Sequence, residues 1–234
     1  MKNYFLFILL LLSYGAHGQN NFMALSFGGT IPLKEFAAYS DLTKNGFALN
    51  GFTGDYSGGF FTQKKIGIGG NIRYASHPVE EKVVQALLAQ ELPDDFPLTE
   101  QPSYIPGFWK HISFLAGPEY TISRSKANID LFVLSGINFI LPPEMSTYAV
   151  NQNDYYKRKM EVRTVNLGFE AGCALRFHLN EYTSIRFHAS WFISKCDGNI
   201  IHEMELQGEK TYNKEKYSCP INTLNGGIGI TYRL

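Results

Sequence analysis

After its first eighteen residues, the 234-residue chain has no apolar run long enough to form a transmembrane helix. Such a helix needs about 20 predominantly apolar residues to cross the hydrocarbon core of a bilayer. If the chain spans a membrane, it must do so with strands whose backbone groups pair in a closed barrel. The start, MKNYFLFILLLLSYGAHGQ, joins Lys2, an apolar run and the small-residue cleavage site Ala16-His17-Gly18. It predicts a secretory signal peptide over residues 1–18 and one mature domain over residues 19–234.

Net charge is also lacking. The 21 basic residues balance the 21 acidic ones, and charged residues make up only 18% of the chain. A chain without excess charge gives no electrostatic reason to expect nucleic acid as a partner. The apolar content of 44% excludes a disordered chain. The composition therefore predicts a globular or membrane-embedded protein.

What the sequence does have is alternation of apolar residues with small or polar ones. In TVNLGFEAGCALRFHL, residues 164–179, every odd position from Val165 to Leu179 is apolar or small. A period of two is typical of strands, and turn residues mark their ends. The pattern predicts eight strands, over residues 22–31, 47–56, 65–74, 109–123, 128–141, 163–179, 182–194 and 221–234.

The connections between these strands alternate in length. Those at 124–127 and 180–181 are tight turns, whereas those at 75–108, 142–162 and 195–220 are long. Short and long connections then fall at opposite strand ends, as in membrane barrels with short periplasmic turns and long extracellular loops. We therefore predict an all-β fold, an eight-stranded antiparallel up-and-down transmembrane β-barrel. Within the first long connection, residues 79–92 have helical apolar spacing and predict a short amphipathic helix that caps the barrel mouth or binds a partner.

Alternation alone also fits a soluble lipocalin-like barrel, which has the same pattern turned inside out. No lysine lies strictly inside the last five predicted strands, since Lys110 lies at the end of one of them, although a strand face in water carries lysine freely. The polar face has small residues and few charges, as a narrow eight-stranded lumen requires. The other face suits lipid, with Tyr120, Tyr182, Trp191 and Tyr232 as candidates for interfacial girdles. We expect the charges inside, with a soluble secreted barrel that binds an apolar ligand as the alternative.

A set of charged side chains is predicted to meet inside this barrel. Enclosed carboxylates need compensating cations, and arginine pairs with carboxylate through two hydrogen bonds. We expect a structural ion-pair network that plugs the lumen, since eight strands leave essentially no aqueous channel. A proton or ion path, or an acid pair for catalysis, is the alternative. The predicted network consists of Glu119, Asp130, Glu170, Arg176, Arg186 and Arg233.

Candidates for metal binding and catalysis are weak. His111, His178 and His188 point inward, but they lack the short ligand spacing of a metal site, so we assign them to the polar network. His188 shares a face with Ser190, yet a lipid-modifying barrel would need both on its outer surface near the outer leaflet. We expect no catalytic residues, no cofactor, no metal and no enzyme activity. A lipid-modifying outer-membrane enzyme is the alternative.

The chain has only three cysteines, Cys173, Cys196 and Cys219, so at most one intrachain disulfide can form. Cys196 and Cys219 lie at the base of the last long connection, and a secreted protein permits a disulfide. We predict a Cys196–Cys219 bridge and a free, lipid-facing Cys173. A metal site of the two cysteines with His202 is the alternative.

From ALSFGGTIPL through FLAGPEYTI and IDLFVLSGINFILPP to the closing LNGGIGITYRL, the mature chain resembles the small outer-membrane β-barrel family, often labelled porin-like. Its last segment looks like that family's insertion signal, although it ends in Leu234 rather than the usual Phe. The resemblance implies location in the cell outer membrane, contact with its lipid, and recognition of the C-terminal strand by the barrel assembly machinery. We expect a structural role or one mediated by the extracellular loops, whose partner is unknown.

Overall fold

The structure is a computed structural model that describes residues 21–62, 65–91, 103–104, 107–143, 147–151, 154–162, 165–206 and 208–234. The predicted signal peptide, residues 1–18, lies outside the described residues. Among those that are described, no helix is long and apolar enough to cross a membrane.

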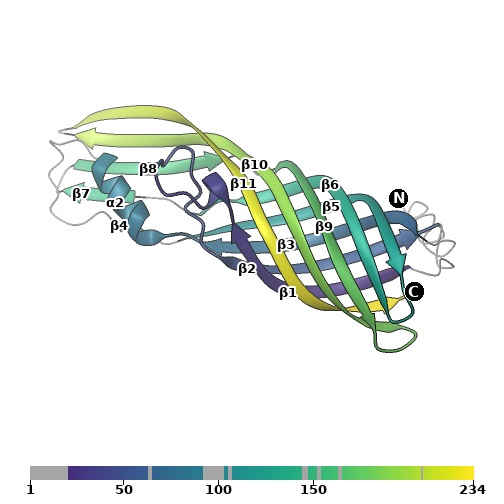
Figure 1. The fold of residues 1–234 in the computed structure, drawn as a ribbon. Coiled ribbons are helices and arrows are strands. Elements are labelled where there is room, and N and C mark those ends of the chain that lie inside the picture. Colours follow the sequence, from purple (N-terminus) through teal and green to yellow (C-terminus); the bar gives the residue numbers. More distant parts are fainter. Residues whose placement is uncertain are drawn as a thin grey trace, which may run out of the picture.

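Eight antiparallel strands close into a barrel (Figure 1). Each strand pairs with the next one along the chain, and β1 closes the ring by pairing with β11, from Phe22 opposite Arg233 to Pro32 opposite Thr223. The predicted up-and-down barrel is confirmed. The eight strands are β1 (Phe22–Pro32), β2 (Gly51–Phe61), β3 (Ile66–Pro78), β5 (Phe108–Ser123), β6 (Ala127–Leu141), β9 (Val165–His178), β10 (Thr183–Leu206) and β11 (Glu209–Arg233).

The period-two pattern determines which side chains point into the barrel. Along β6, Asn128 and Asp130 are buried whereas Ile129, Leu131 and Val133 are exposed. Successive side chains of a strand point to opposite faces, so the polar set lines the lumen and the apolar set forms the exterior.

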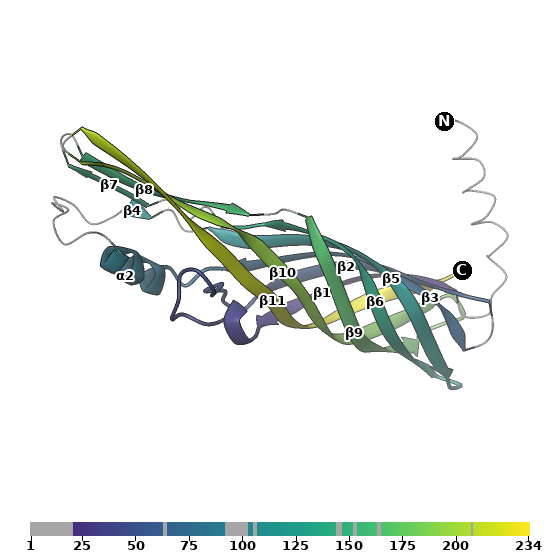
Figure 2. The same ribbon diagram turned by 90° about the horizontal axis from the view of Figure 1, so that it is seen from above.

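The short turns lie at the end of the barrel where the C-terminus is found (Figure 2). The β5–β6 turn closes with the Arg124 amide donating to the Ala127 carbonyl at 2.8 Å. In the β9–β10 turn, the Asn180 side-chain oxygen accepts from the amides of Tyr182 at 2.9 Å and Thr183 at 2.8 Å. Asparagine favours such turns because its side chain satisfies backbone amides locally.

At the other end, two connections that we predicted as long loops contain strands instead. β10 and β11 continue past the ring in unbroken register, through Cys196 opposite Cys219 to Leu206 opposite Glu209. The connection at 142–162 holds β7 (Thr147–Asn151) and β8 (Asp154–Val162), and β4 (Ser103–Tyr104) pairs with β7. β8 pairs with β10, so these strands extend one sheet beyond the barrel (Figures 1 and 2). We call β4, β7, β8, Gly198–Leu206 of β10 and Glu209–Tyr217 of β11 the projection.

The start of the second predicted strand was also misplaced. We predicted that the second strand would begin at residue 47, whereas β2 begins at Gly51. Phe47 has a φ of 53°, which a strand does not permit, and its ring is fully buried in the β1–β2 connection. Burial of one aromatic ring in the loop therefore outweighs the local strand propensity of the sequence.

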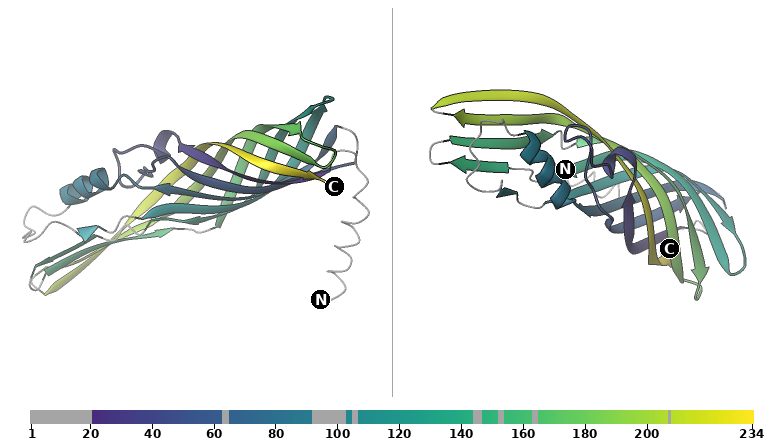
Figure 3. Two further views of the ribbon diagram at one scale, coloured as in Figure 1. Left: turned by 90° about the horizontal axis from the view of Figure 1, so that it is seen from below. Right: turned by 60° about the vertical axis from the view of Figure 1, so that its left-hand side comes forward.

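Two segments cover the mouth of the barrel at the long-loop end. The β1–β2 connection contains the short 3-10 helix η1 (Lys34–Phe36), and α2 (Glu81–Glu91) follows β3. Figure 3 shows both at the end from which the projection extends. The predicted helix over residues 79–92 is confirmed as α2. It buries Val84 completely and packs Val83 and Leu87 on the same apolar cluster as the barrel strands.

Candidate functional site

Two groups of buried charges lie in the lumen, one near the middle of the strands and one nearer the short turns. In the first, Arg73 of β3 bridges two carboxylates: its Nε donates to Asp55 Oδ1 at 2.6 Å, and its Nη2 lies 2.7 Å from Glu170 Oε1. All three side chains are 3% exposed or less. His188 Nε2 lies 3.1 Å from Asp55 Oδ2. This group links β2, β3, β9 and β10 across the lumen.

The second group centres on Arg176 of β9. Its Nε and Nη2 donate to Asp130 Oδ2 and Oδ1, each at 2.7 Å, which is a bidentate pair. Thr121 Oγ1 donates to Asp130 Oδ1 at 2.7 Å, and the Arg176 guanidinium lies 4.0 Å from the centre of the Phe22 ring. Both carboxylate oxygens of Asp130 therefore have a charge-assisted hydrogen bond.

Glu119 and Arg186 lie beside these pairs. Arg186 Nη1 donates to Ser57 Oγ, and Glu119 is 4% exposed. Glycines give the Glu119 carboxylate its space, because a Cβ at Gly69 would lie 2.5 Å from Glu119 Oε2 and one at Gly59 would lie 2.9 Å from it. Larger residues at either position would displace the carboxylate.

The structure thus places five of the six predicted network residues inside the lumen and one outside it. Asp130 and Arg176 pair with each other, whereas Glu170 pairs with Arg73, which we did not predict. Arg233 is exposed at the short-turn mouth, so its assignment to the enclosed network is corrected. It is the last residue of β11, and the strand ends before its side chain can be enclosed.

Sequence analysis missed Asp55 and Arg73, the two residues that complete the network. Their signal was available, because Thr53, Asp55 and Ser57 alternate along β2 with exposed Phe52 and Tyr56. The polar face was traced through the last five strands only. The misplaced start of β2 also obscured which of its residues face the lumen.

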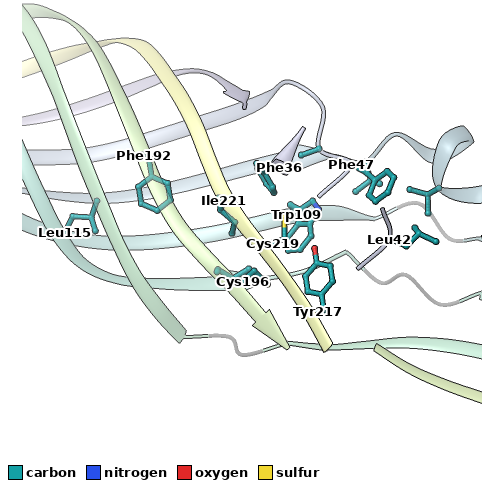
Figure 4. Close-up of a cluster of buried hydrophobic side chains, with 14 of the residues drawn as sticks. Phe36, Leu42, Phe47, Trp109, Leu115, Phe192, Cys196, Tyr217, Cys219 and Ile221 are labelled. Atoms are coloured by element: carbon teal, nitrogen blue, oxygen red, sulfur yellow. The ribbon is translucent and has the colours of Figure 1, made fainter. Parts of the chain in front are cut away.

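The half of the lumen nearer the projection is filled by stacked rings. His111 stacks on Phe192 with ring centres 5.2 Å apart, and Phe36 meets Trp109 edge-on at 5.7 Å. Trp109 Nε1 donates to the Gly46 carbonyl at 2.6 Å, and Tyr217 stacks on Trp109 at 6.5 Å. Figure 4 shows Phe36, Trp109, Phe192 and Tyr217 in this cluster. We call Phe36, His77, Trp109, His111, Phe192 and Tyr217 the aromatic column.

The three histidines assigned to the network separate. His188 lies at Asp55, His111 belongs to the aromatic column, and the Nδ1 atom of His178 lies 2.9 Å from Ser184 Oγ near the short turns. His188 and Ser190 are both buried in the lumen, at 8% and 2% exposure, rather than on the outer surface. Over the described part of the chain, no three His, Cys, Asp or Glu side chains gather as a metal site would require.

Space among the buried charges is small. A cavity of about 10 Å³ lies between Glu119, Arg186, Phe22 and Asn71. That volume accommodates about one water molecule. The buried side chains around this cavity are therefore closely packed.

The barrel exterior is a continuous apolar surface. Exposed residues occur on every strand of the ring, among them Phe27 at 55%, Ile68 at 65%, Val133 at 60%, Leu167 at 67% and Ile230 at 64%. Water-soluble proteins rarely expose apolar patches larger than a few hundred Å². This exterior excludes the soluble barrel that was our alternative.

Aromatic residues lie towards both ends of that surface. Tyr182 and Tyr232 stack at the short-turn end with ring centres 6.2 Å apart, and Trp191 lies towards the other end. Such girdles mark the two membrane interfaces of transmembrane barrels. The closed ring, the apolar exterior and the short turns define an integral outer-membrane β-barrel, and the cell outer membrane is its location.

No family model matches the chain, and no curated protein matches it. Among solved structures, the chain is similar to Neisserial surface protein A, with 8% identity and a TM-score of 0.46 over 93% of this chain and 98% of that one. It is also similar to the attachment invasion locus protein Ail of Yersinia pestis, with 14% identity and a TM-score of 0.44 over 92% and 99%. A third similar structure is that of the outer membrane protein AlkL in lipid bilayers, with 13% identity and a TM-score of 0.39 over 92% of this chain and 90% of that one. Because these TM-scores are low, the assignment as an outer-membrane β-barrel rests on the closed ring and the apolar exterior of this chain.

Proposed function

We propose that this protein is a non-enzymatic outer-membrane barrel that presents the projection at the cell surface for interaction, with its lumen plugged. The observation that carries the proposal is the length of β10 and β11, which have 24 and 25 residues, whereas the other six strands of the ring have 11 to 16. A tilted strand crosses a bilayer in about 9–11 residues. More than half of each long strand is therefore free to extend beyond the membrane.

The side chains of the projection support a role in water. Tyr155 donates to Glu203 at 2.6 Å, and Lys210 lies 3.2 Å from Glu205. Tyr212, on the outermost strand, is 66% exposed. A paired sheet with exposed charges and aromatic rings holds these groups in fixed positions, which lowers the entropy cost of binding a partner.

Two features of the lumen support the plug. The buried ion pairs lie near the middle of the lumen and towards the short turns, and the aromatic column lies towards the projection. A solute would have to disrupt both layers to pass. We therefore propose that the barrel acts as a membrane anchor rather than as a channel.

The test of the interaction role replaces residues 199–216 by a short turn joining Gly198 to Tyr217, which are partners in the β10–β11 register. This removes the strand on which β8 depends and leaves the ring pairs intact. We expect the variant to keep its gel shift on boiling but to fail to restore cell attachment and aggregation in a deletion strain. Full restoration by the shortened barrel would contradict the proposal.

The plug and the absence of catalysis are tested separately. Liposomes containing the wild-type barrel should swell in a small sugar no faster than protein-free liposomes, and faster swelling would favour transport instead. Incubation with outer-leaflet lipid should give no modified product. A modified lipid that is no longer formed by the His188→Ala variant would establish enzyme activity.

We also propose that the barrel assembly machinery recognises β11. The strand ends at Arg233 with Tyr232 exposed, the exposed Leu234 follows it, and β1 pairs with its last eleven positions. Removing residues 232–234 should reduce the amount of folded barrel in the outer membrane, whereas Leu234→Phe should not. Equal assembly of the shortened chain would contradict this recognition.

A further inference from the structure

The short-turn mouth contains an open cavity of about 640 Å³ that the proposed function does not use. It lies between the start of β3, the β5–β6 turn, the β9–β10 turn and the end of β11. Pockets for small ligands commonly measure about 300–1,000 Å³. We call this cavity the basin, and its lining includes Lys65, Arg124, Arg176, His178, Thr231 and Arg233.

The rim of the basin is basic. Lys65, Arg124 and Arg233 come from three separate elements, and all three are exposed. Within the described chain, none of these three side chains forms a salt bridge. Glu181 is the acidic residue on the lining, and it is exposed as well. Three cations against one carboxylate make the basin attractive to anions.

The floor of the basin is polar and buried. Arg176 is 3% exposed and its charge is neutralised by Asp130, so this pair separates the basin from the lumen. Thr231 is 1% exposed, and its hydroxyl has no hydrogen-bond partner among the described residues. Leaving a buried donor unsatisfied costs about 1–3 kcal/mol, and a bound acceptor would remove that cost.

We propose that the basin binds a phosphate-type oxyanion presented from the periplasmic side, held by Arg124, Arg233 and Lys65 and by the Thr231 hydroxyl. Guanidinium groups match the oxygens of phosphate through two parallel hydrogen bonds. The volume is larger than one phosphate needs, so it has room for an attached organic group. A free phosphate ester and the headgroup of an inner-leaflet phospholipid share this chemistry.

The experiment uses the mature barrel in a maltoside detergent, which has no phosphate of its own. Titration with glycerol 3-phosphate and with inorganic phosphate, followed by calorimetry, should show saturable binding. The double variant Arg124→Gln, Arg233→Gln should weaken it about tenfold or more, because two charge-assisted contacts are lost. Thr231→Val, which keeps the side-chain shape, should weaken it by a smaller factor.

Lys126→Gln is the matched control. Lys126 lies in the same β5–β6 turn as Arg124 and is also exposed, but it does not line the basin. It should change the affinity less than about twofold. Failure of both phosphate probes to saturate by ~10 mM, or an equal loss in Lys126→Gln, would overturn the proposal. The gel shift on boiling verifies that each variant is folded.

A second arm identifies the source of the phosphate. The barrel stays in the phosphate-free maltoside, with or without added phosphatidylglycerol, and glycerol 3-phosphate is titrated again. Weaker apparent binding in the presence of phosphatidylglycerol assigns the basin to a lipid headgroup. Unchanged binding assigns it to a soluble phosphate ester.

Discussion

At the residue scale, the Arg176–Asp130 pair gives the sharpest prediction. Arg176→Ala leaves the fully buried Asp130 without its bidentate partner. Breaking a buried pair in this way costs roughly 3–5 kcal/mol, so the free energy of unfolding in urea should fall by that amount. The exposed Arg124→Ala is the control and should have little effect. Liposome swelling should not change in either variant, because the aromatic column fills the other half of the lumen.

The two buried cysteines give a second prediction at this scale. Cys196 and Cys219 are direct cross-strand partners, they are fully buried, and the structure has both as free thiols. Paired antiparallel residues have Cα atoms about 4.5–5.5 Å apart, which is within disulfide range. An extracytoplasmic thiol oxidant should therefore bridge them, and the closed loop should add roughly 3 kcal/mol.

Mass spectrometry after alkylation without reductant checks the bridge. Only Cys173, which is exposed on the barrel exterior, should be alkylated in the denatured chain. Alkylation of all three thiols would show that the bridge does not form. Cys173→Ala should leave the stability unchanged, whereas Cys219→Ala should lower it.

The sequence predicted burial of residues better than it predicted their partners. Parity alone identified Asp130, Glu170 and Arg176 as inward-facing, because side-chain direction in a strand depends only on counting. Alternation does not tell which inward-facing side chains meet across the lumen, so the pairing of Glu170 on β9 with Arg73 on β3 was not foreseen. These two strands are not neighbours in the sheet, so their contact depends on closure of the ring.

At the scale of elements, Trp109 holds the β1–β2 connection over the barrel mouth. Trp109→Phe keeps a ring in the aromatic column but removes the hydrogen bond to the Gly46 carbonyl. We expect the free energy of unfolding to fall by about 0.5–1.5 kcal/mol. We also expect faster protease cleavage after the exposed Lys44 in the folded barrel. Phe108→Leu, at the exposed neighbour on β5, should leave cleavage unchanged. Equal cleavage in both variants would mean that the indole does not anchor the connection.

Strands could be predicted from the sequence where one of their two faces is buried. They could not be predicted where both faces are in water. The ring strands have a lipid face and a lumen face, and their alternation was visible in the sequence. The distal hairpin, IIHEMELQGEKTYNKEK, has polar residues on both faces of much of its length. A strand in water on two sides needs no period of two, so sequence analysis predicted a loop where β10 and β11 continue.

At the scale of the whole molecule, the absence of lysine from the inner stretches of the last five predicted strands proved to be the decisive feature of composition. Exposed Ile, Leu, Val and Phe surround the ring, while the exposed lysines Lys195, Lys210 and Lys214 lie above it on β10 and β11. Exposed charged side chains therefore lie beyond the apolar band along the barrel axis, as a bilayer between two aqueous phases requires. The projection and the basin lie in those two aqueous phases, on opposite sides of the membrane.

This separation predicts opposite results for the same substitution at two exposed sites. Val133, near the middle of β6, is 60% exposed, and Tyr212 of the projection is 66% exposed. Val133→Lys should lower the free energy of unfolding in phospholipid vesicles by about 2–4 kcal/mol, because it places a charge at the bilayer midplane. Tyr212→Lys should have an effect within about 0.5 kcal/mol, because that site is in water. Urea titration followed by tryptophan fluorescence measures both, and equal stability of the two variants would place the ring exterior in water rather than in lipid.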